Sequence, residues 1–414
     1  MEFQIYTGES IENALSALGI NAKFIKHISN CTTTKYHFDL KDFVQESKIN
    51  SAIKFLSMKT HAPIKYGYSK IADFCLEMPN KERFYPTYDQ TWYGINNYDC
   101  AAISFGYNED MEILTRKLED LPHMLVAGST GSGKSIFLNN VISNLHYRDD
   151  CALVLIDPKQ VEFSQFANSH QLYMPIITEV DDAISVLHIL CNEMDERYKQ
   201  LKACGLRDNS TNKFCKIVVV VDELADLMLT SKYEVEESIV RLAQKGRAAG
   251  MHLILATQRP TVNVVTGLIQ ANIPCRVCFT VAKVRDSVVM LDKGGAEKLL
   301  GKGDCLIKLP DRSELVRIQA PYISMEDIKR LMPNEPREWK NEYNRKLAHL
   351  PPLAKTASTS HKTSWIDKIL GKLGFDRSRP QRMRNSSISA PEPQVPYNID
   401  EQNFFDCVDD DEEN

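Results

Sequence analysis

The chain has 414 residues, of which 25% are charged, and a formal net charge of −5. This length allows two or three domains with buried cores, and the negative charge excludes a protein coated in basic surface, so any nucleic acid must bind in a local groove or pore. No apolar run approaches the roughly 18 residues of a membrane-spanning helix, and the amino terminus lacks a signal-peptide pattern, so we expect a cytoplasmic protein without an integral membrane segment.

Residues 1–95 are expected to form a small separate α/β domain. A capping serine, apolar residues at helical spacing and a terminal glycine predict a helix over residues 10–19, and a second helix is expected over 49–58. Alternation of polar and apolar residues predicts strands over 34–40 and 74–79. Nothing in this region has the pattern of an active site, so a scaffold or subunit-contact role is the default interpretation.

An apolar strand pattern over residues 124–127 leads into a glycine-rich loop and then into a helix pattern. The loop fits G-x-x-x-x-G-K-[ST] in full, and the flanking strand and helix disfavour the alternative of a plain glycine-rich loop. Its glycines let the backbone wrap a phosphate, and Lys134 would reach the β- and γ-phosphates of ATP while the Ser135 hydroxyl ligates Mg²⁺. The predicted nucleotide-binding residues are Gly128, Ser129, Thr130, Gly131, Ser132, Gly133, Lys134 and Ser135.

Continuous apolar runs predict further strands over residues 151–157, 217–223, 251–258 and 275–281. A long helix is expected over 181–203. Such runs are typical of a parallel sheet covered by helices on both faces. The predicted fold is therefore an α/β P-loop NTPase with a mainly parallel central sheet, whose ligands bind at the carboxyl ends of the strands.

An acid pair, Asp222 and Glu223, closes one of these strands. ATP hydrolysis needs an acid to hold Mg²⁺ and a base to orient the attacking water, so we assign Asp222 to the metal and Glu223 to catalysis. Thr257 and Gln258, at the end of the next strand, would place polar groups beside the γ-phosphate. Asp157 and Lys159 end a third strand and are as compatible with strand capping as with a role in the cleft.

The eleven cysteines are scattered. Cys275 and Cys278 form a C-x-x-C, but they fall within a predicted strand, where positions i and i+3 face opposite ways. No second pair stands at zinc-finger spacing, so packing is favoured over metal binding or redox chemistry.

The expected motor domain covers residues 96–330 and is followed by a charged helix and linker over 331–375. An amphipathic segment over 365–373 precedes an arginine-rich stretch, and the chain finishes in an acidic run. Residues 376–414 are expected to be disordered in isolation. The amphipathic segment could dock on a protein partner or a membrane surface, and a solvated linker helix is the alternative.

Several sequence blocks resemble the FtsK/SpoIIIE family of double-stranded DNA translocases, in the family's order. The resemblance covers roughly residues 10–325 and includes a segment of the small domain before the motor. The blocks of the motor lie at residues 121–135, 155–159, 192–198, 221–228, 245–260, 267–274 and 291–304.

This resemblance implies a RecA-like motor that assembles as a hexameric ring around duplex DNA and moves it by ATP hydrolysis. In such a ring, an arginine of the neighbouring subunit could stabilise charge that develops on the γ-phosphate. The candidates are Arg247 and Arg276, with Arg259 less favoured, and a structural ion pair is the alternative for each.

The chain departs from the cell-division members of the family, because it shows neither their membrane anchor nor their winged-helix domain. We therefore expect a motor of a plasmid, phage or mobile element. A protein partner would recruit it through the carboxyl-terminal segment and could hold it at the periphery of a membrane. There are three alternatives to a double-stranded DNA translocase: a secretion ATPase that acts on proteins, a single-stranded DNA coupling protein of conjugation, and a subunit that binds ATP only for its structure.

Overall fold

The computed structural model describes residues 7–68, 71–96, 98, 100–146 and 148–332. The chain divides into two units, Met1–Ser360 and His361–Asn414, and all described residues belong to the first. The charged helix, linker, amphipathic segment and acidic tail expected after residue 332 lie outside the described residues.

The first part of the chain folds into an antiparallel sheet of four described strands in the order β1-β2-β4-β3. The expected helices over 10–19 and 49–58 correspond to α1 and α2, and the expected strands over 34–40 and 74–79 correspond to β2 and β4. One face of the sheet packs with both helices around Ile11, Leu15, Phe38 and Phe74. The elements are α1 (Gly8–Ala17), β1 (Ala22–Ser29), β2 (Thr33–Leu40), α2 (Glu46–Thr60), β3 (Lys65–Gly67) and β4 (Phe74–Pro79).

The strands β1 and β3 escape the sequence pattern for a physical reason. β1 carries mostly exposed or half-buried residues, and its pairing with β2 shifts register between Phe24 and Lys26. A bulge of this kind interrupts the alternation on which strand prediction depends. β3 has only three residues, too few to show a period.

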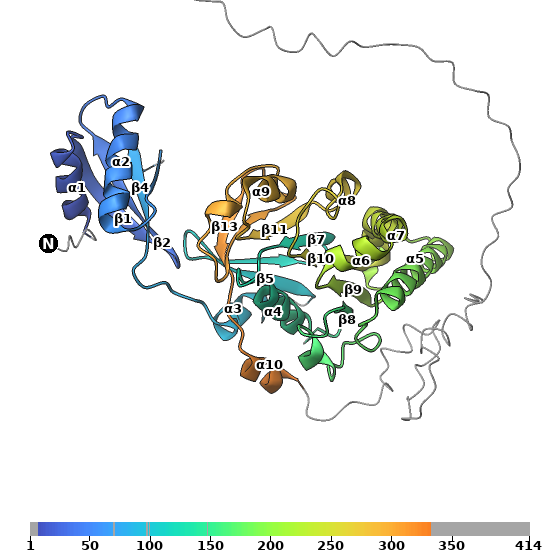
Figure 1. Ribbon diagram of the computed structural model, residues 1–414. Helices are drawn as coiled ribbons and strands as arrows, with labels where there is room; N and C mark the ends of the chain where they lie inside the picture. The colour runs from blue at the N-terminus through green and yellow to red at the C-terminus, as the bar shows by residue number, and fades with distance from the viewer. Residues whose placement is uncertain (1–6, 69–70, 97, 99, 147, 333–414) are drawn as a thin grey trace, which may run out of the picture. The chain divides into compact units, whose positions relative to one another are not determined.

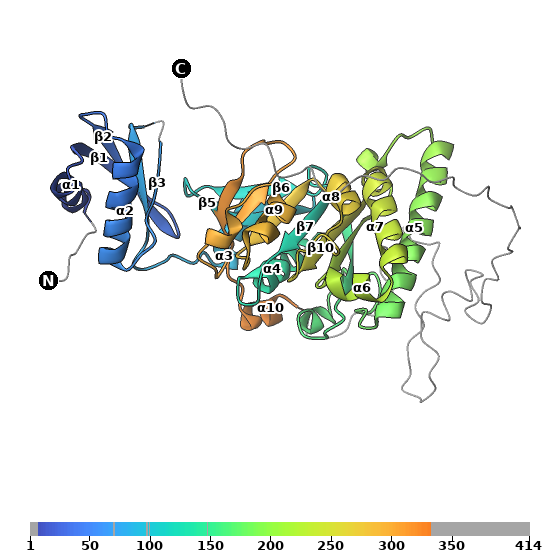
Figure 2. The same cartoon turned by 45° about the horizontal axis from the view of Figure 1, so that its top comes forward.

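The rest of the described chain forms a nine-stranded sheet in the order β6-β5-β13-β12-β11-β7-β10-β9-β8, flanked by helices. Figure 1 and Figure 2 show the strands of this sheet side by side. The elements are α3 (Tyr88–Asn96), β5 (Ala102–Asn108), β6 (Ile113–Lys117), β7 (His123–Ala127), α4 (Lys134–His146), β8 (Cys151–Ile156), α5 (Val180–Ala203), β9 (Lys216–Val221), α6 (Leu224–Thr230), α7 (Lys232–Lys245), β10 (Met251–Thr257), α8 (Gly267–Asn272), β11 (Cys275–Phe279), α9 (Val284–Leu291), β12 (Asp304–Lys308), β13 (Val316–Gln319) and α10 (Met325–Leu331).

The sheet is mixed, with a parallel and an antiparallel half. The five strands predicted from apolar runs, β7 to β11, all pair in parallel. β12, β13, β5 and β6 extend the sheet from β11 by antiparallel pairing, which the sequence analysis did not anticipate. The α/β P-loop architecture is confirmed, and the parallel half is the part that carries its nucleotide loop.

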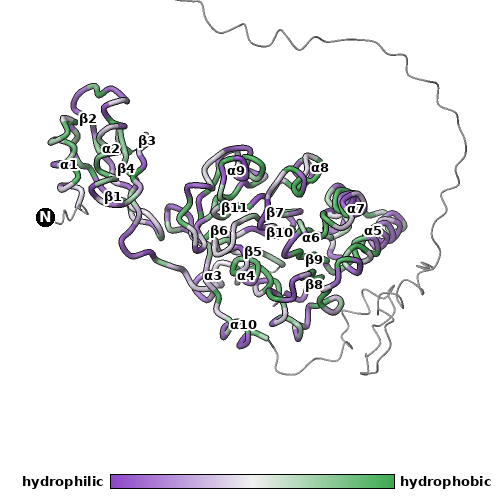
Figure 3. The backbone as a smooth tube through the Cα atoms, viewed as in Figure 1, coloured by the Kyte–Doolittle hydropathy of each residue, from purple (hydrophilic) through white to green (hydrophobic). Residues whose placement is uncertain are grey.

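Helices cover both faces of the parallel half. Every residue of β7, β8, β9, β10 and β11 is buried, as expected for strands between two helical layers. α4 lies with α3 and α10, whereas α5, α6, α7 and α8 contact one another in a second group. Figure 3 shows hydrophobic and hydrophilic residues alternating along the tubes of α5 and α7, which have one buried and one solvent-exposed side.

The transition between the two sheets comes earlier in the chain than residue 95. Tyr88, the first residue of α3, is 3% exposed and belongs to the core of the nine-stranded sheet. α3 packs against β5 and β6. The structure therefore groups α3 with the second sheet, whereas the expected boundary near residue 95 places it with the amino-terminal domain.

Candidate functional site

The loop between β7 and α4 is fastened to the neighbouring strands by backbone hydrogen bonds. The Ser129 N–H donates to the Thr280 carbonyl at 2.9 Å, and the Gly303 N–H donates to the Ser132 carbonyl at 2.8 Å. Gly133 has a φ of +113°, and a Cβ there would lie 2.6 Å from the Gly303 nitrogen. Only glycine satisfies both conditions, so this position fixes the close approach of the two segments.

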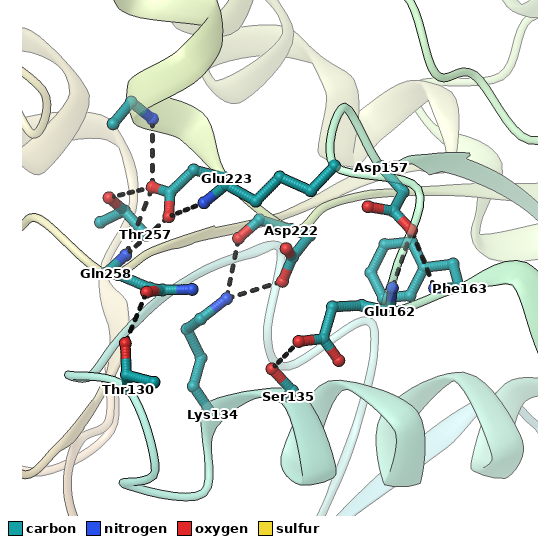
Figure 4. Close-up of polar contacts among 12 residues, drawn as sticks. Thr130, Lys134, Ser135, Asp157, Glu162, Phe163, Asp222, Glu223, Thr257 and Gln258 are labelled. Carbon is teal, nitrogen blue, oxygen red and sulfur yellow. Dashed lines mark hydrogen bonds and ion pairs between the residues drawn. The ribbon is translucent and has the colours of Figure 1, made fainter.

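Lys134, the first residue of α4, points at the acid pair after β9 (Figure 4). Its Nζ lies 2.6 Å from Asp222 Oδ1 and 2.9 Å from the Asp222 carbonyl oxygen, and both side chains are at most 3% exposed. The other carboxylate oxygen, Asp222 Oδ2, is buried and has no hydrogen-bond partner among the described residues. The sheet order β7-β10-β9 brings these two residues together from positions 88 apart in the sequence.

The Glu223 carboxylate is held by four groups. It accepts hydrogen bonds from the Thr257 hydroxyl at 2.6 Å, from the Gln258 N–H, from Lys159 Nζ at 3.2 Å and from the Ala225 N–H. The last contact makes Glu223 the N-cap of α6. The Gln258 side chain in turn accepts from the Thr130 hydroxyl at 3.0 Å, so the phosphate loop and Glu223 share one hydrogen-bonded network.

Lys159 is the residue of the β8 end that reaches this network. Partial burial lowers the pKa of its ammonium, but the Glu223, Asp226 and Asp222 carboxylates outweigh that effect and hold the pKa above its ordinary value. Lys159 is therefore a permanent cation beside Glu223. The sequence alone left open whether it belonged to the cleft.

Ser135 has a partner that the sequence analysis missed. Its hydroxyl donates to Glu162 Oε1 at 2.7 Å (Figure 4). Asp157 Oδ2 accepts the N–H groups of Glu162 and Phe163 at 2.9 and 3.0 Å and so fixes the loop that presents Glu162. Asp157 thus positions this loop. No local pattern marks Glu162, because it lies in an irregular segment after β8.

A cavity of about 550 Å³ opens above the phosphate loop. This volume lies in the range of pockets that enclose small ligands. Lys134 and Lys302 are the cations among its described lining residues. The cavity is also lined by Tyr85, Ala320, Pro321 and Tyr322, none of which the sequence pattern marks as site residues.

The three candidate arginines differ in their surroundings. Arg276 is 6% exposed, and its guanidinium donates to the carbonyls of Gln270, Ile273 and Met290 and to Asp292. These contacts within one subunit favour the structural alternative. Arg247 and Arg259 are both exposed. Arg247 precedes β10, at the opposite end of that strand from Thr257.

The C-x-x-C cysteines lie inside the sheet. Cys275 and Cys278 are both buried on β11, and burial raises the pKa of the Cys275 thiol to about 12. Among the described residues, no group of three or more His, Cys, Asp or Glu side chains is arranged to hold a metal ion. This surrounding is that of a thiol that packs as a small apolar group.

The residues that could hold Mg²⁺ are Ser135 and Asp222. The buried, unpartnered Oδ2 of Asp222 fits this assignment, since it offers a carboxylate oxygen next to the phosphate loop. A hydroxyl and a carboxylate are oxygen donors of the kind that Mg²⁺ prefers when nucleotide phosphates and water supply the remaining ligands.

The chain is similar in sequence to known P-loop proteins of one family. The FtsK/SpoIIIE family model matches residues 95–214 and 208–262. The DNA translocase FtsK of Corynebacterium glutamicum is 36% identical over 353 residues, which cover 77% of this chain and 38% of that protein. The FtsK proteins of Oceanobacillus iheyensis and Clostridium tetani are 35% and 36% identical over 82% and 78% of this chain, and 47% and 46% of their own lengths are covered. The chain thus spans less than half the length of these curated relatives.

Two solved structures share the fold. The pCW3 conjugation coupling protein TcpA with ATPγS has a TM-score of 0.57 at 24% identity, over 77% of this chain and 98% of that chain. The cytoplasmic domain of the type VII secretion ATPase EccC of Thermomonospora curvata has a TM-score of 0.52 at 21% identity, over 58% of this chain and 32% of that chain.

None of the helices in the described part of the chain is both long and apolar enough to cross a membrane. Four findings point to the same family: the phosphate loop, the acid pair at the end of β9, the P-loop architecture and the sequence identity to the FtsK proteins. The chain belongs to the FtsK/SpoIIIE family.

Proposed function

We propose that this protein is an ATPase that uses hydrolysis to move double-stranded DNA. The observation that carries the ATPase is the contact of Lys134 with Asp222, beside a Glu223 carboxylate held by Thr257 and Gln258. DNA as the substrate is supported by the relatives, which are DNA translocases at 35–36% identity.

Each residue of the site has a task in this proposal. The loop N–H groups and Lys134 bind the phosphates, which would draw the Lys134 ammonium from its present partner Asp222. Ser135 and Asp222 would hold Mg²⁺, which neutralises charge on the phosphate oxygens. Glu223 orients the attacking water and takes its proton, while Thr257 and the Gln258 N–H keep that carboxylate in place.

The site favours completion by a second subunit. No arginine occurs among the described residues that line the cavity, and charge on the γ-phosphate is commonly stabilised by such a group. We propose that the exposed Arg247 of a neighbouring subunit supplies it within a hexameric ring whose pore holds the duplex. A pore lined by local lysines, arginines and backbone donors is compatible with the net charge of −5.

The test is steady-state ATP hydrolysis with long duplex DNA, with single-stranded DNA and without DNA. We expect duplex DNA to stimulate hydrolysis strongly. In the variants Lys134→Ala and Glu223→Gln the hydrolysis rate should fall by a factor of about 100 or more, since each substitution removes a group that contacts the reacting atoms. An exposed-lysine variant such as Lys199→Ala, on α5 away from the cavity, is the matched control and should behave like the wild type.

The outcomes separate the candidates. Stimulation by single strands alone would replace the duplex motor with a single-stranded DNA coupling protein. Hydrolysis that ignores all nucleic acid would contradict the translocase and favour an ATPase that acts on protein substrates. Activity that survives Glu223→Gln would contradict the assigned base.

A further inference from the structure

The proton of the Ser135 hydroxyl has a fixed destination. Ser135 Oγ lies 2.7 Å from Glu162 Oε1 (Figure 4), and the hydroxyl is the donor, because an ionised carboxylate only accepts. This distance falls in the range of hydrogen bonds to a charged oxygen, which are about twice as strong as neutral ones. A hydroxyl has one proton and two lone pairs. With its proton on Glu162, both lone pairs of Ser135 stay available to a cation.

The loop that carries Glu162 is itself held by several hydrogen bonds. Asp157, which is 1% exposed, accepts the N–H groups of Glu162 and Phe163. The Gln165 side chain donates to the Glu162 carbonyl and, at 3.2 Å, to Asn139 Oδ1 on α4. The loop is therefore tied both to the end of β8 and to the helix that begins at the phosphate loop. These ties set the position of the Glu162 carboxylate beside Ser135.

Glu162 differs from the acid pair of the site in its charge environment. Lys134 pairs with Asp222, and Lys159 pairs with Glu223. In the part of the chain that the structure describes, no lysine or arginine forms an ion pair with Glu162, although this residue lines the nucleotide cavity. A carboxylate without a cation disfavours bare phosphate oxygens beside it and favours a dication. The charge of Glu162 therefore suits a metal-bound nucleotide.

We propose that Glu162 is a positioning residue for magnesium: it accepts the Ser135 proton and so keeps the lone pairs of that hydroxyl free for the metal. This inference rests on the proposed ATPase, in which Ser135 and Asp222 hold Mg²⁺. In this structure Asp222 is engaged by Lys134, and the Ser135 proton goes to Glu162 instead. Outer partners of this kind orient a metal ligand and strengthen metal binding. Glu162 acts through Ser135 and does not contact the metal.

The experiment measures how much Mg²⁺ strengthens binding of the non-hydrolysable β,γ-imido analogue of ATP to the full chain. Titration calorimetry in Mg²⁺ and in EDTA gives two dissociation constants, and their ratio is the magnesium gain. We expect Glu162→Ala to reduce the magnesium gain by a factor of about 10 to 100, the usual cost of losing an outer partner of a metal ligand. The dissociation constant in EDTA should not rise, because the phosphate loop and Lys134 remain. A rise in EDTA as well would show that Glu162 only supports the fold of the site, and would overturn the proposal.

A double variant tests whether Glu162 acts through Ser135. Ser135→Ala removes the metal ligand and should itself reduce the magnesium gain. If Glu162 acts through that hydroxyl, adding Glu162→Ala to Ser135→Ala should lower the gain by less than about twofold further. A carboxylate that held the metal directly or through water would add its full effect. Full additivity of the two substitutions would therefore overturn the positioning role.

Glu162→Gln is the conservative variant. Its amide oxygen still accepts the Ser135 proton, so the magnesium gain should stay closer to the wild type than to Glu162→Ala. A Glu162→Gln variant as weak as Glu162→Ala would show that charge alone matters, and would overturn the proposal.

Glu237→Ala is the matched control. It removes an exposed glutamate of α7, outside the cavity lining, and should leave both dissociation constants unchanged. Equal magnesium gains in Glu162→Ala and the wild type would overturn the positioning role while leaving the ATPase in place. A wild-type chain that binds the analogue in neither condition would overturn the proposed function itself.

Discussion

At the scale of single residues, the Thr257 hydroxyl governs the orientation of the Glu223 carboxylate. It donates to Glu223 Oε1 at 2.6 Å, and both side chains are nearly inaccessible to solvent. Thr257→Val removes a buried hydrogen bond to a charged group, which is worth about 1.5 kcal/mol or somewhat more. We expect kcat for ATP hydrolysis to fall about tenfold, with KM unchanged, because Thr257 is not among the residues that line the nucleotide cavity.

Thr257→Ser is the control for this prediction, since it keeps the hydroxyl and should retain most of kcat. A rise in KM without a change in kcat would show that Thr257 acts on nucleotide binding. That result would contradict the role assigned from the hydrogen bond.

At the scale of elements, Arg276 joins β11 to the ends of two helices. Its guanidinium binds the Gln270 and Ile273 carbonyls at the end of α8 and the Met290 carbonyl near the end of α9. Helix ends leave carbonyls without partners inside the helix, and Arg276 satisfies several of them at once. We expect Arg276→Ala to lower the free energy of unfolding by about 3 kcal/mol, measured by denaturant titration, because buried acceptors lose their donor.

Arg247→Ala separates a structural arginine from one that acts in a neighbouring site. Arg247 is exposed, so its removal should change stability by less than about 0.5 kcal/mol. If Arg247 acts across a subunit interface, its loss abolishes DNA-stimulated hydrolysis without loss of stability. If instead Arg276→Ala were stable and Arg247→Ala destabilised, the structural role of Arg276 and the role of Arg247 in a neighbouring site would both be contradicted.

At the scale of the whole molecule, a pair of buried histidines couples stability to pH. Burial, aided by the neighbouring His252 and Arg247, lowers the pKa of His123 to about 3. Burial also lowers the pKa of His252 to about 4, with Lys216 acting in the same direction and Glu119 and the Pro122 carbonyl opposing. In the unfolded chain both rings titrate near 6.5, so between that value and about 4 the unfolded state binds more protons.

The fold should therefore lose stability as the pH falls below about 6.5. Each ring contributes about 1.6 kcal/mol of destabilisation between pH 6.5 and 5, because one pKa unit corresponds to about 1.4 kcal/mol and the unfolded ring is already half protonated at pH 6.5. Denaturant titrations at a series of pH values measure this slope. A double variant, His123→Gln with His252→Gln, should reduce this slope, and the remainder is expected from His146, whose pKa burial also lowers to about 4. An unchanged slope would show that other groups cause the acid sensitivity.

The sequence predicted the parallel half of the sheet and the centre of the site because both follow from local patterns. Apolar runs identified β8, β9, β10 and β11, and the strand-loop-helix pattern identified Lys134 and Ser135. The acid pair could be assigned because parallel strands bring their carboxyl ends to one edge. The antiparallel strands β12 and β13 were missed, since they are short and only partly buried.

The amino-acid sequence by itself determined the class of fold, the phosphate loop, its acid pair and the resemblance to FtsK/SpoIIIE proteins, each of which is written in residues close together in the chain. Tertiary structure alone decided that Glu162 contacts Ser135, that Arg276 faces helix ends, and that Tyr85 and Tyr322 line one cavity. The physical reason is that periodicity reports which side of an element is buried, whereas the partner across a cleft depends on how distant segments pair.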